Sequence, residues 1–147
     1  MNNVRPIDLT GARVSDKFWG EYMELVRSQV IPYQWEALND RIEGATPSHC
    51  IHNFRVAAGL EEGGFQGFVF QDSDLYKWLE AVAWSLAWHP DAKLEALADE
   101  TIDLIGAAQQ PDGYLDTKYI IDGLENRFTD LMNNHELYCL GHMIEAA

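Results

Sequence analysis

The stretch that decides the fold is Asn133-Asn-His-Glu-Leu-Tyr-Cys-Leu-Gly-His-Met-Ile-Glu-Ala-Ala147. Asn134 predicts a helix that starts at His135, because an asparagine side chain accepts hydrogen bonds from the free N–H groups of a first turn. Glu136 suits the positive end of the helix dipole. At about 100° per residue, one face carries His135, Cys139, His142 and Ala146, and the opposite face carries Leu137, Leu140 and Ile144. We expect the leucine face to pack and the other face to present chemistry.

This helix reaches Ala147 without the glycine, asparagine, basic last turn or proline that commonly marks a helix C-terminus. We therefore expect the chain to be cut within the helix and to be the first part of a longer protein. The apolar face would then lack its packing partners, and exposed patches of that size promote association.

Two interpretations of the histidine and cysteine face remain open. His135-Glu-x-x-Cys139 has the spacing of the zinc-protease helix H-E-x-x-H, and His142 is a third candidate ligand one turn later. A zinc site also needs side chains that orient the ligands, and the sequence identifies none. We therefore favour packing, with Cys139 as a small buried hydrophobic residue. The His-Cys-Ile-His cluster at 49–52 is interpreted in the same way, because adjacent ligands rarely reach one ion.

Hydrophobic periodicity predicts further helices upstream. They cover residues 15–30, 33–38, 53–60, 72–89 and about 91–109. Pro32 is expected to bend or end the first of them. A flexible glycine-rich loop is expected over 63–67, where Phe65 and the nearby Phe68 suit either packing or the rim of a sugar site. Residues 116–133 are expected to form a long connection with one short turn over 129–132.

The helix expected over 72–89 carries charged residues with two interpretations. Asp72 and Ser73 are expected to cap its start, although carboxylates at 72 and 74 beside a glycine-rich loop also suit sugar hydroxyls. Lys77 and Glu80, three residues apart, are interpreted as an exposed ion pair.

Composition limits the classes of protein that remain. The 147 residues are 47% hydrophobic with five Trp, which is typical of one globular core. Ten basic and 24 acidic residues give a formal charge of −14, so we expect neither nucleic acid nor an anionic membrane as a partner. The sequence has no signal-peptide pattern and no apolar stretch of roughly 20 residues. Two distant cysteines make the reducing cytoplasm the expected location.

The order of elements is helix after helix, preceded by an irregular lead-in segment over residues 1–15. No stretch alternates convincingly between apolar and polar residues as a half-buried strand does. This pattern predicts an all-α fold of antiparallel helical hairpins.

Five strings spread over nearly the whole chain carry a family resemblance. They are Ile31-Pro-Tyr-Gln-Trp-Glu-Ala-Leu-Asn-Asp40, Ile51-His-Asn-Phe-Arg-Val-Ala-Ala58, Gly67-Phe-Val-Phe-Gln-Asp-Ser-Asp-Leu-Tyr-Lys-Trp-Leu-Glu-Ala81, Ala108-Gln-Gln-Pro-Asp-Gly-Tyr-Leu115 and the stretch from His135 to Ala147. In this order they are similar to the start of glycoside hydrolase family 127, the β-L-arabinofuranosidases. The resemblance implies an (α/α)6 toroid, with residues 1–147 as the N-terminal portion of the catalytic domain and with later helices and β-sandwich domains absent.

The resemblance also implies a retaining β-L-arabinofuranosidase that releases L-arabinofuranose from arabino-oligosaccharides or glycoconjugates. In the family a zinc-held cysteine thiolate is the nucleophile, a glutamate is the acid/base, and cysteine and glutamate side chains hold the zinc. All of these lie further along the family's chain. We therefore expect no catalytic residue, no metal ligand and no bound zinc in this chain, and no activity from it alone.

Substrate contact is the part of the family's site that carries over. The first histidine of the HELYC string binds sugar in the family and matches His135, and a neutral imidazole can both donate to and accept from hydroxyls. Gln71, Asp72 and Asp74 are added from the FQDSD string. The alternative function is a non-catalytic helical fragment that binds carbohydrate or another protein. A second copy of the chain is a further candidate partner.

Overall fold

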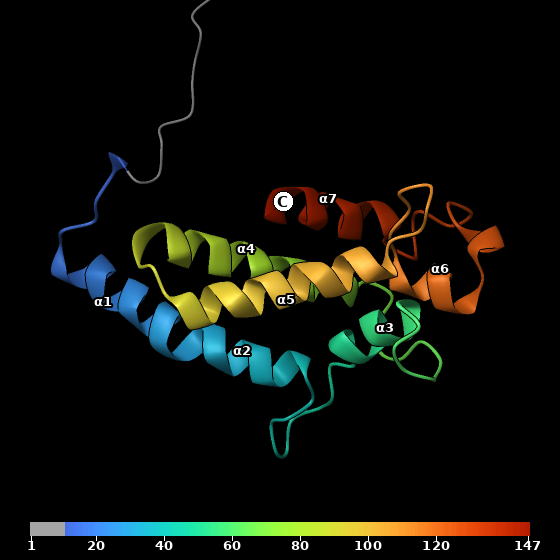
Figure 1. The fold of residues 1–147 in the computed structure, drawn as a ribbon, viewed down its shortest axis with the longest axis horizontal. Helices are drawn as coiled ribbons and strands as arrows, with labels where there is room; N and C mark the ends of the chain where they lie inside the picture. Colours follow the sequence, from blue (N-terminus) through green and yellow to red (C-terminus); the bar gives the residue numbers. More distant parts are fainter. Residues whose placement is uncertain (1–10) are drawn as a thin grey trace, which may run out of the picture.

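The computed structural model describes residues 11–147, and this range contains helices and no strand (Figure 1). The α-helices are α1 Lys17–Leu25, α2 Ile31–Leu38, α3 Cys50–Ala57, α4 Asp72–Trp88, α5 Ala92–Ala108, α6 Thr117–Asp122 and α7 Glu136–Ala146. A π-helical turn, Val26–Val30, joins α1 to α2, and a 3₁₀ turn, Leu124–Asn126, follows α6. Residues 1–10 of the predicted lead-in lie outside the described residues, and 12–15 are irregular.

Helix α4 is the centre of the arrangement and contacts α2, α3, α5 and α7. Helices α4 and α7 lie side by side and run in the same direction, whereas α5 and the α1–α2 segment run the opposite way (Figure 1). Parallel neighbours separated in sequence by an antiparallel helix are what a repeating helical hairpin produces. As a result, α4 and α7 begin at the same end of the molecule.

The apolar side of α4 forms most of the core. Leu75, Trp78, Leu79 and Val82 are buried as the periodicity predicted, and Phe54 of α3 is buried against them. Fully burying a side chain of this size contributes about 1.5–3 kcal/mol each. Trp78 also donates from Nε1 to the carbonyl oxygen of Ile31 at 3.1 Å, which ties α4 to α2.

Two predicted helix starts are confirmed by their caps. The carboxylate of Asp16 accepts from Trp19 N at 2.8 Å at the start of α1. The carboxylate of Asp91 accepts from Lys93 N at 3.0 Å and Leu94 N at 3.1 Å at the start of α5. Both caps use partners within three residues, so local sequence is sufficient to predict them.

The chain remains helical through Pro32, where we predicted a bend or an end. The N–H of Ile31 reaches back five residues to the carbonyl oxygen of Val26, which is the hydrogen-bond pattern of a π-turn. Pro32 has no N–H to donate, so a local departure from the α-helical pattern just before it leaves the chain's direction intact.

Helix α7 packs through the face opposite to the one predicted. Cys139 is 1% exposed and packs in the core, whereas Leu137, Leu140 and Ile144 are 54%, 42% and 64% exposed. The leucine face therefore does not pack within the described chain, which agrees with the expectation that it lacks its partners, and the interpretation of Cys139 as a small buried residue is confirmed. Cys139 is small enough to let the backbones of α4 and α7 approach closely, whereas Leu137, Leu140 and Ile144 stay exposed.

The connections also differ from expectation in two places. Residues 116–133 contain helix α6, which we did not predict because six residues are too few for an apolar stripe. The loop over 63–67, predicted to be flexible, is fastened by Asn53: its Nδ2 donates to Gln66 O at 2.8 Å, and its Oδ1 accepts from Gln66 N at 3.0 Å.

Candidate functional site

The segments that lead into α4 and α7 meet at one end of the molecule, because the two helices are parallel neighbours (Figure 1). The contact that joins them is between Phe70, just before α4, and His135, just before α7. Their ring centroids are 5.5 Å apart with the rings inclined at 61°. The structure therefore brings together the FQDSD and HELYC strings, which are more than 60 residues apart in sequence.

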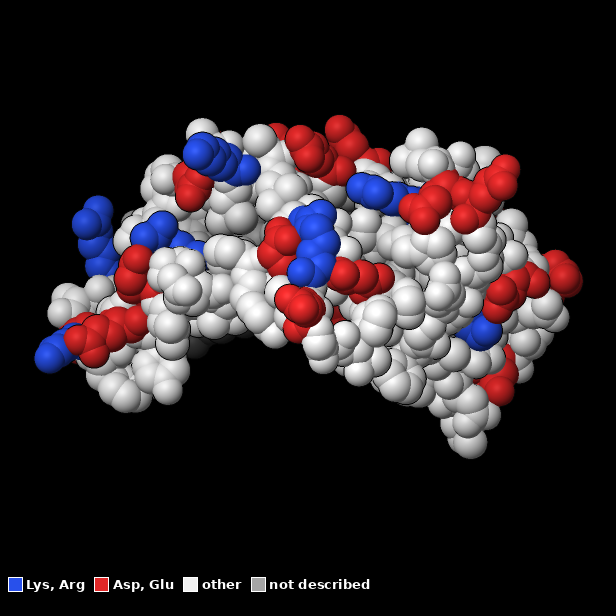
Figure 2. Space-filling model, turned by 90° about the horizontal axis from the view of Figure 1, so that it is seen from below, with Lys and Arg blue, Asp and Glu red and all other residues white. Residues whose placement is uncertain are grey.

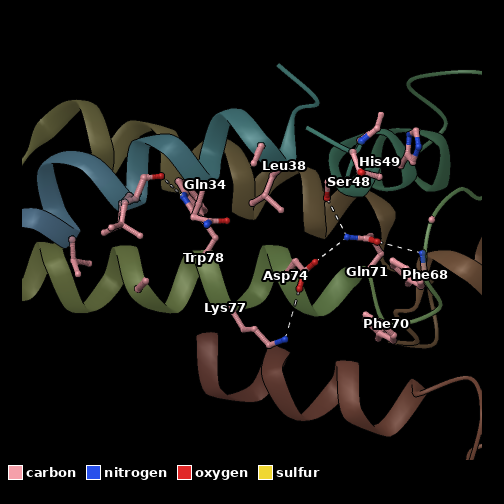
Figure 3. A pocket seen from close by; sticks show the side chains of 18 residues that line it. Gln34, Leu38, Ser48, His49, Phe68, Phe70, Gln71, Asp74, Lys77 and Trp78 are labelled. Atoms are coloured by element: carbon pink, nitrogen blue, oxygen red, sulfur yellow. Dashed lines mark hydrogen bonds and ion pairs between the residues drawn. The ribbon is translucent and has the colours of Figure 1, made fainter. Parts of the chain in front are cut away.

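Gln71 is the hydrogen-bonding centre of the FQDSD side of this end (Figure 3). Its Nε2 donates to Ser48 Oγ at 3.1 Å and to Asp74 Oδ2 at 2.8 Å. Its Oε1 accepts from Phe68 N at 3.3 Å. With both amide hydrogens engaged, Gln71 fixes the orientation of Asp74 and of the loop before α4.

Gly67 gives Gln71 the space it needs. Its φ is +85°, a left-handed conformation that side chains resist, and a Cβ there would lie 2.9 Å from Gln71 Oε1 and 3.2 Å from Ser48 O. Only glycine fits this position without moving the glutamine. Ser48 is itself held, because the carboxylate of Asp40 accepts from the backbone N–H groups of Ser48 and His49.

Gln71 and Asp74 line a cleft of about 850 Å³ between α2, α4 and the loops over 46–49 and 67–70 (Figure 3). Most of its wall is apolar and includes Trp78 and Phe70. Its polar lining includes Gln34, Ser48, Gln71, Asp74 and Lys77. An apolar wall with a few fixed polar groups is typical of a small-molecule site.

Asp74 and Lys77 form the ion pair of this polar part. Lys77 Nζ lies 3.7 Å from Asp74 Oδ1, and both side chains are about two-fifths exposed, at 39% and 40%. Burial raises the pKa of the Asp74 carboxyl, and the nearby charges of Lys77 and His142 oppose that rise. The predicted Lys77–Glu80 pair does not form, because Glu80 Oε1 instead accepts from Trp84 Nε1 at 3.4 Å.

His135 occupies the position just before α7 and does not start the helix as predicted. Its φ is +58°, and its Nδ1 donates to the carbonyl oxygen of Asn133 at 2.9 Å. A neutral ring with its hydrogen on Nδ1 keeps Nε2 as an acceptor. Asn134 does not cap the helix, because its Nδ2 donates to Tyr119 Oη at 2.7 Å.

Asp72 lies apart from this arrangement. Its carboxylate is buried, and its two oxygens accept from the backbone N–H and the hydroxyl of Thr117. Burial raises the pKa of Asp72 to about 6, and the hydrogen bonds from Thr117 oppose the rise. Asp72 thus does not cap α4 but joins the start of α4 to the start of α6, and this buried position does not support the predicted contact with sugar.

Glu136 is a second buried carboxylate and fixes the start of α7. Its Oε1 accepts from Tyr114 Oη at 2.6 Å, and its Oε2 accepts from Phe128 N at 2.9 Å. The sequence assigned Glu136 only to the helix dipole. Its partners come from the loops on both sides of α6, so the carboxylate fastens the segment that presents His135.

Two residues near His135 were not predicted as site residues. Lys77 Nζ donates to Tyr138 Oη at 2.9 Å, and the Tyr138 ring meets His135 edge-on at 5.9 Å. No sequence pattern indicates this pair, because the two residues are 61 positions apart.

The two cysteines are buried and free, and burial raises the pKa of both thiols. Cys50 Sγ donates to Gln71 O at 3.3 Å. Over residues 11–147 the side chains form no group of three or more His, Cys, Asp or Glu with the arrangement of a metal site. A zinc ion therefore does not fit the residues described.

Charged side chains are scattered over the face shown in Figure 2 and do not gather into a basic patch. The hollow lower outline of that view is formed mainly by uncharged side chains. None of the described helices combines the length and the apolar character that crossing a membrane requires.

Residues 12–147 match the family model described as the β-L-arabinofuranosidase GH127 catalytic domain. A non-reducing end β-L-arabinofuranosidase from Bifidobacterium longum subsp. longum is 46% identical over 150 aligned positions, which cover 91% of this chain and 23% of that protein.

Two solved structures agree with this match. A GH127 β-L-arabinofuranosidase from Geobacillus stearothermophilus T6 is 60% identical with a TM-score of 0.90, over 92% of this chain and 21% of that one. A second GH127 β-arabinofuranosidase is 32% identical with a TM-score of 0.82, over 97% of this chain and 23% of that one. The chain thus spans between a fifth and a quarter of the length of these relatives.

The predicted fold class, an all-α part of an (α/α)6 toroid, is confirmed by these structures. The matched region includes every helix described above and both strings that meet at His135 and Phe70. The chain belongs to the β-L-arabinofuranosidase family GH127.

Proposed function

We propose that this chain forms the N-terminal portion of the catalytic domain of a retaining β-L-arabinofuranosidase, and that it carries part of the sugar pocket. The observation that supports this most is the contact between Phe70 and His135, which joins the two family strings at the shared end of α4 and α7. The substrates we propose are arabino-oligosaccharides or glycoconjugates that end in L-arabinofuranose.

His135 and Asp74 are the residues we propose to contact the sugar. His135 keeps Nε2 as an acceptor for a hydroxyl, because Nδ1 donates to Asn133 O. Asp74 is partly exposed in the cleft, and its carboxyl oxygens can accept hydrogen bonds from sugar hydroxyls. Gln71 belongs to the same site as the residue that orients Asp74.

The chemistry of bond cleavage is proposed to come from outside the described residues. A retaining glycosidase needs a proton donor and a nucleophile on opposite sides of the glycosidic bond. Cys50 and Cys139 do not suit the nucleophile's role, because both are buried and burial favours their neutral thiols. We therefore place the nucleophile, the acid/base and the zinc ligands of the complete enzyme further along its chain, with the remaining helices and the β-sandwich domains.

The test is hydrolysis of an aryl β-L-arabinofuranoside by the complete protein, together with its zinc content after dialysis. We expect turnover and about one zinc per chain. Binding of L-arabinose without turnover would instead support the alternative, a non-catalytic carbohydrate-binding protein. The absence of both turnover and sugar binding would overturn the proposed site.

Partner and location remain predictions from composition. The formal charge of −14 disfavours nucleic acid and anionic membranes, and a second copy of the chain is a candidate partner. The cytoplasm is proposed because both cysteines are free thiols.

A further inference from the structure

Lys77 has a partner on each side of its ammonium group. Nζ donates to Ser73 Oγ at 3.0 Å and to Tyr138 Oη at 2.9 Å, and it lies 3.7 Å from Asp74 Oδ1. An ammonium group has three N–H donors and no acceptor. Two of its hydrogens are donated to Ser73 and Tyr138, and Asp74 is its counter-ion, so Lys77 holds its neighbours in place.

Tyr138 is left with an unused donor by this arrangement. A phenol can accept and donate at the same oxygen, and here the oxygen accepts from Lys77. Over residues 11–147 the Tyr138 hydroxyl makes no other hydrogen bond, and the residue is 44% exposed. Its own hydrogen is therefore available to a ligand, and a hydroxyl that accepts from a cation is a stronger donor.

The ring of Tyr138 is fixed between two histidines. It meets His135 edge-on with centroids 5.9 Å apart at 89°, and it meets His142 edge-on at 4.7 Å and 82°. Lys77 Nζ also lies 5.0 Å from the ring centroid. These contacts hold the hydroxyl in one place, so a ligand would not have to order it on binding.

Tyr138 and His135, whose ring centroids are 5.9 Å apart, thus present one donor and one acceptor. His135 Nε2 accepts, because Nδ1 is engaged by Asn133 O, and Tyr138 Oη donates, because its oxygen is engaged by Lys77. Two neighbouring hydroxyls of a sugar match this pair, since one can donate to the ring nitrogen while the other accepts from the phenol.

We propose that Tyr138 is a sugar-binding residue held in position by Lys77, and that with His135 it binds two neighbouring hydroxyls of one sugar unit. This inference rests on the proposed function and adds a residue that was not predicted as a site residue from the sequence. The ligand is an uncharged polyol, because Asp74 is already the counter-ion of Lys77.

The test uses the complete protein and an aryl β-L-arabinofuranoside. Tyr138→Phe keeps the ring between the two histidines and removes only the hydroxyl. We expect kcat/KM to fall about tenfold, the usual effect of losing one hydrogen bond to substrate. Tyr33→Phe, which changes an exposed tyrosine of α2, is the matched control and should keep the wild-type value.

Lys77→Met separates positioning from general structural support. If Lys77 acts through Tyr138, the single variant loses kcat/KM, and the double variant Lys77→Met/Tyr138→Phe is no worse than Tyr138→Phe alone. Losses that multiply in the double variant would overturn the positioning role. Lys93→Met, at the exposed start of α5, is the matched control.

The outcomes also distinguish this inference from the proposed function. If the wild-type protein shows neither turnover nor sugar binding, the proposed function is wrong, and so is the proposed role of Tyr138. If the wild-type protein is active and Tyr138→Phe has the same kcat/KM, only the proposed role of Tyr138 is wrong. A tenfold loss in Tyr138→Phe with an unchanged melting temperature supports both.

Discussion

Asp72 accepts hydrogen bonds from both the backbone N–H and the hydroxyl of Thr117, although 45 residues separate the two. Both residues are buried, so the pair joins the start of α4 to the start of α6 without solvent. The sequence assigned Asp72 to capping or to sugar. Its position shows that it organises the loops around the proposed site.

Thr117→Val should destabilise the protein by about 1–3 kcal/mol, because it removes one donor from a buried carboxylate while keeping the side chain's shape. The measurement is the denaturant midpoint with the slope of the transition. Thr101→Val is the control, since the Thr101 hydroxyl bonds only within its own helix, to Leu97 O at 2.7 Å, and should cost less. Equal losses in the two variants would contradict a special role for the Asp72–Thr117 pair.

The stability of the protein should fall as pH rises between about pH 4 and pH 8. Burial raises the pKa of Asp72 from 3.8 to about 6 and that of Asp116 from 3.8 to about 8, and the nearby charge of Asp72 adds to the shift of Asp116. The folded state therefore binds these protons more tightly than the unfolded chain does. This contribution is complete below pH 3.8 and is lost as pH passes through 6 and then 8.

Asp116→Asn tests that sign, because an amide cannot ionise and can still cap α6, where Asp116 Oδ1 accepts from Tyr119 N at 3.3 Å. We expect the free energy of unfolding of this variant to decrease much less above pH 6 than that of the wild type. The measurement is urea unfolding at several pH values. Asp99→Asn, an exposed change on α5, should follow the wild-type curve. A variant curve parallel to wild type would exclude Asp116 as the source.

His135→Ala in the complete protein should lower kcat/KM by roughly ten- to a hundredfold while leaving the melting temperature nearly unchanged. The side chain is partly exposed ahead of α7, so little packing is lost with it. His89→Ala, at the far end of α4, is the control. A large drop in melting temperature with activity retained would make His135 a structural residue.

Residues 1–147 expressed alone should self-associate or bind a hydrophobic dye, because α7 exposes Leu137, Leu140 and Ile144 together. Leu140→Lys/Ile144→Lys should reduce both effects, as read by sedimentation and dye fluorescence. Leu60→Ser, which changes a single exposed residue at 69%, should not. A monomer that binds no dye would show that this face does not drive association.

The parts of the fold that the sequence predicted are those decided by near neighbours. The predicted helix starts near Asp16 and Asp91 are made by side chains that accept from N–H groups two or three residues away, and the buried stripe of α4 follows from its periodicity. Asn134 and Asp72 look like caps by the same local rule, yet their partners are Tyr119 and Thr117. Nothing local distinguishes the two cases.

The site shows the same limit. His135 was indicated by a string of adjacent residues, whereas the Lys77–Tyr138 pair exists only because α4 and α7 are neighbours. The face of α7 that packs could not be chosen from hydrophobicity alone, because the smaller Cys139 lies against the core and the larger leucines do not. The size of the side chains at the contact between α4 and α7 determines which face packs, and hydrophobic periodicity does not report side-chain size.

The π-turn at Val26–Val30 sets the angular phase between α1 and α2. One extra residue in a turn rotates everything before it by about 100° relative to an unbroken α-helix. The rings of Phe18, Trp19 and Tyr22 contact one another on α1, and Ile31 and Leu38 are buried on α2. The π-turn therefore determines which way the aromatic cluster faces relative to the buried side of α2. Deleting one residue between 26 and 30 would therefore restore an unbroken α-helical hydrogen-bond ladder and leave that aromatic cluster and the core of α2 in the same relative orientation.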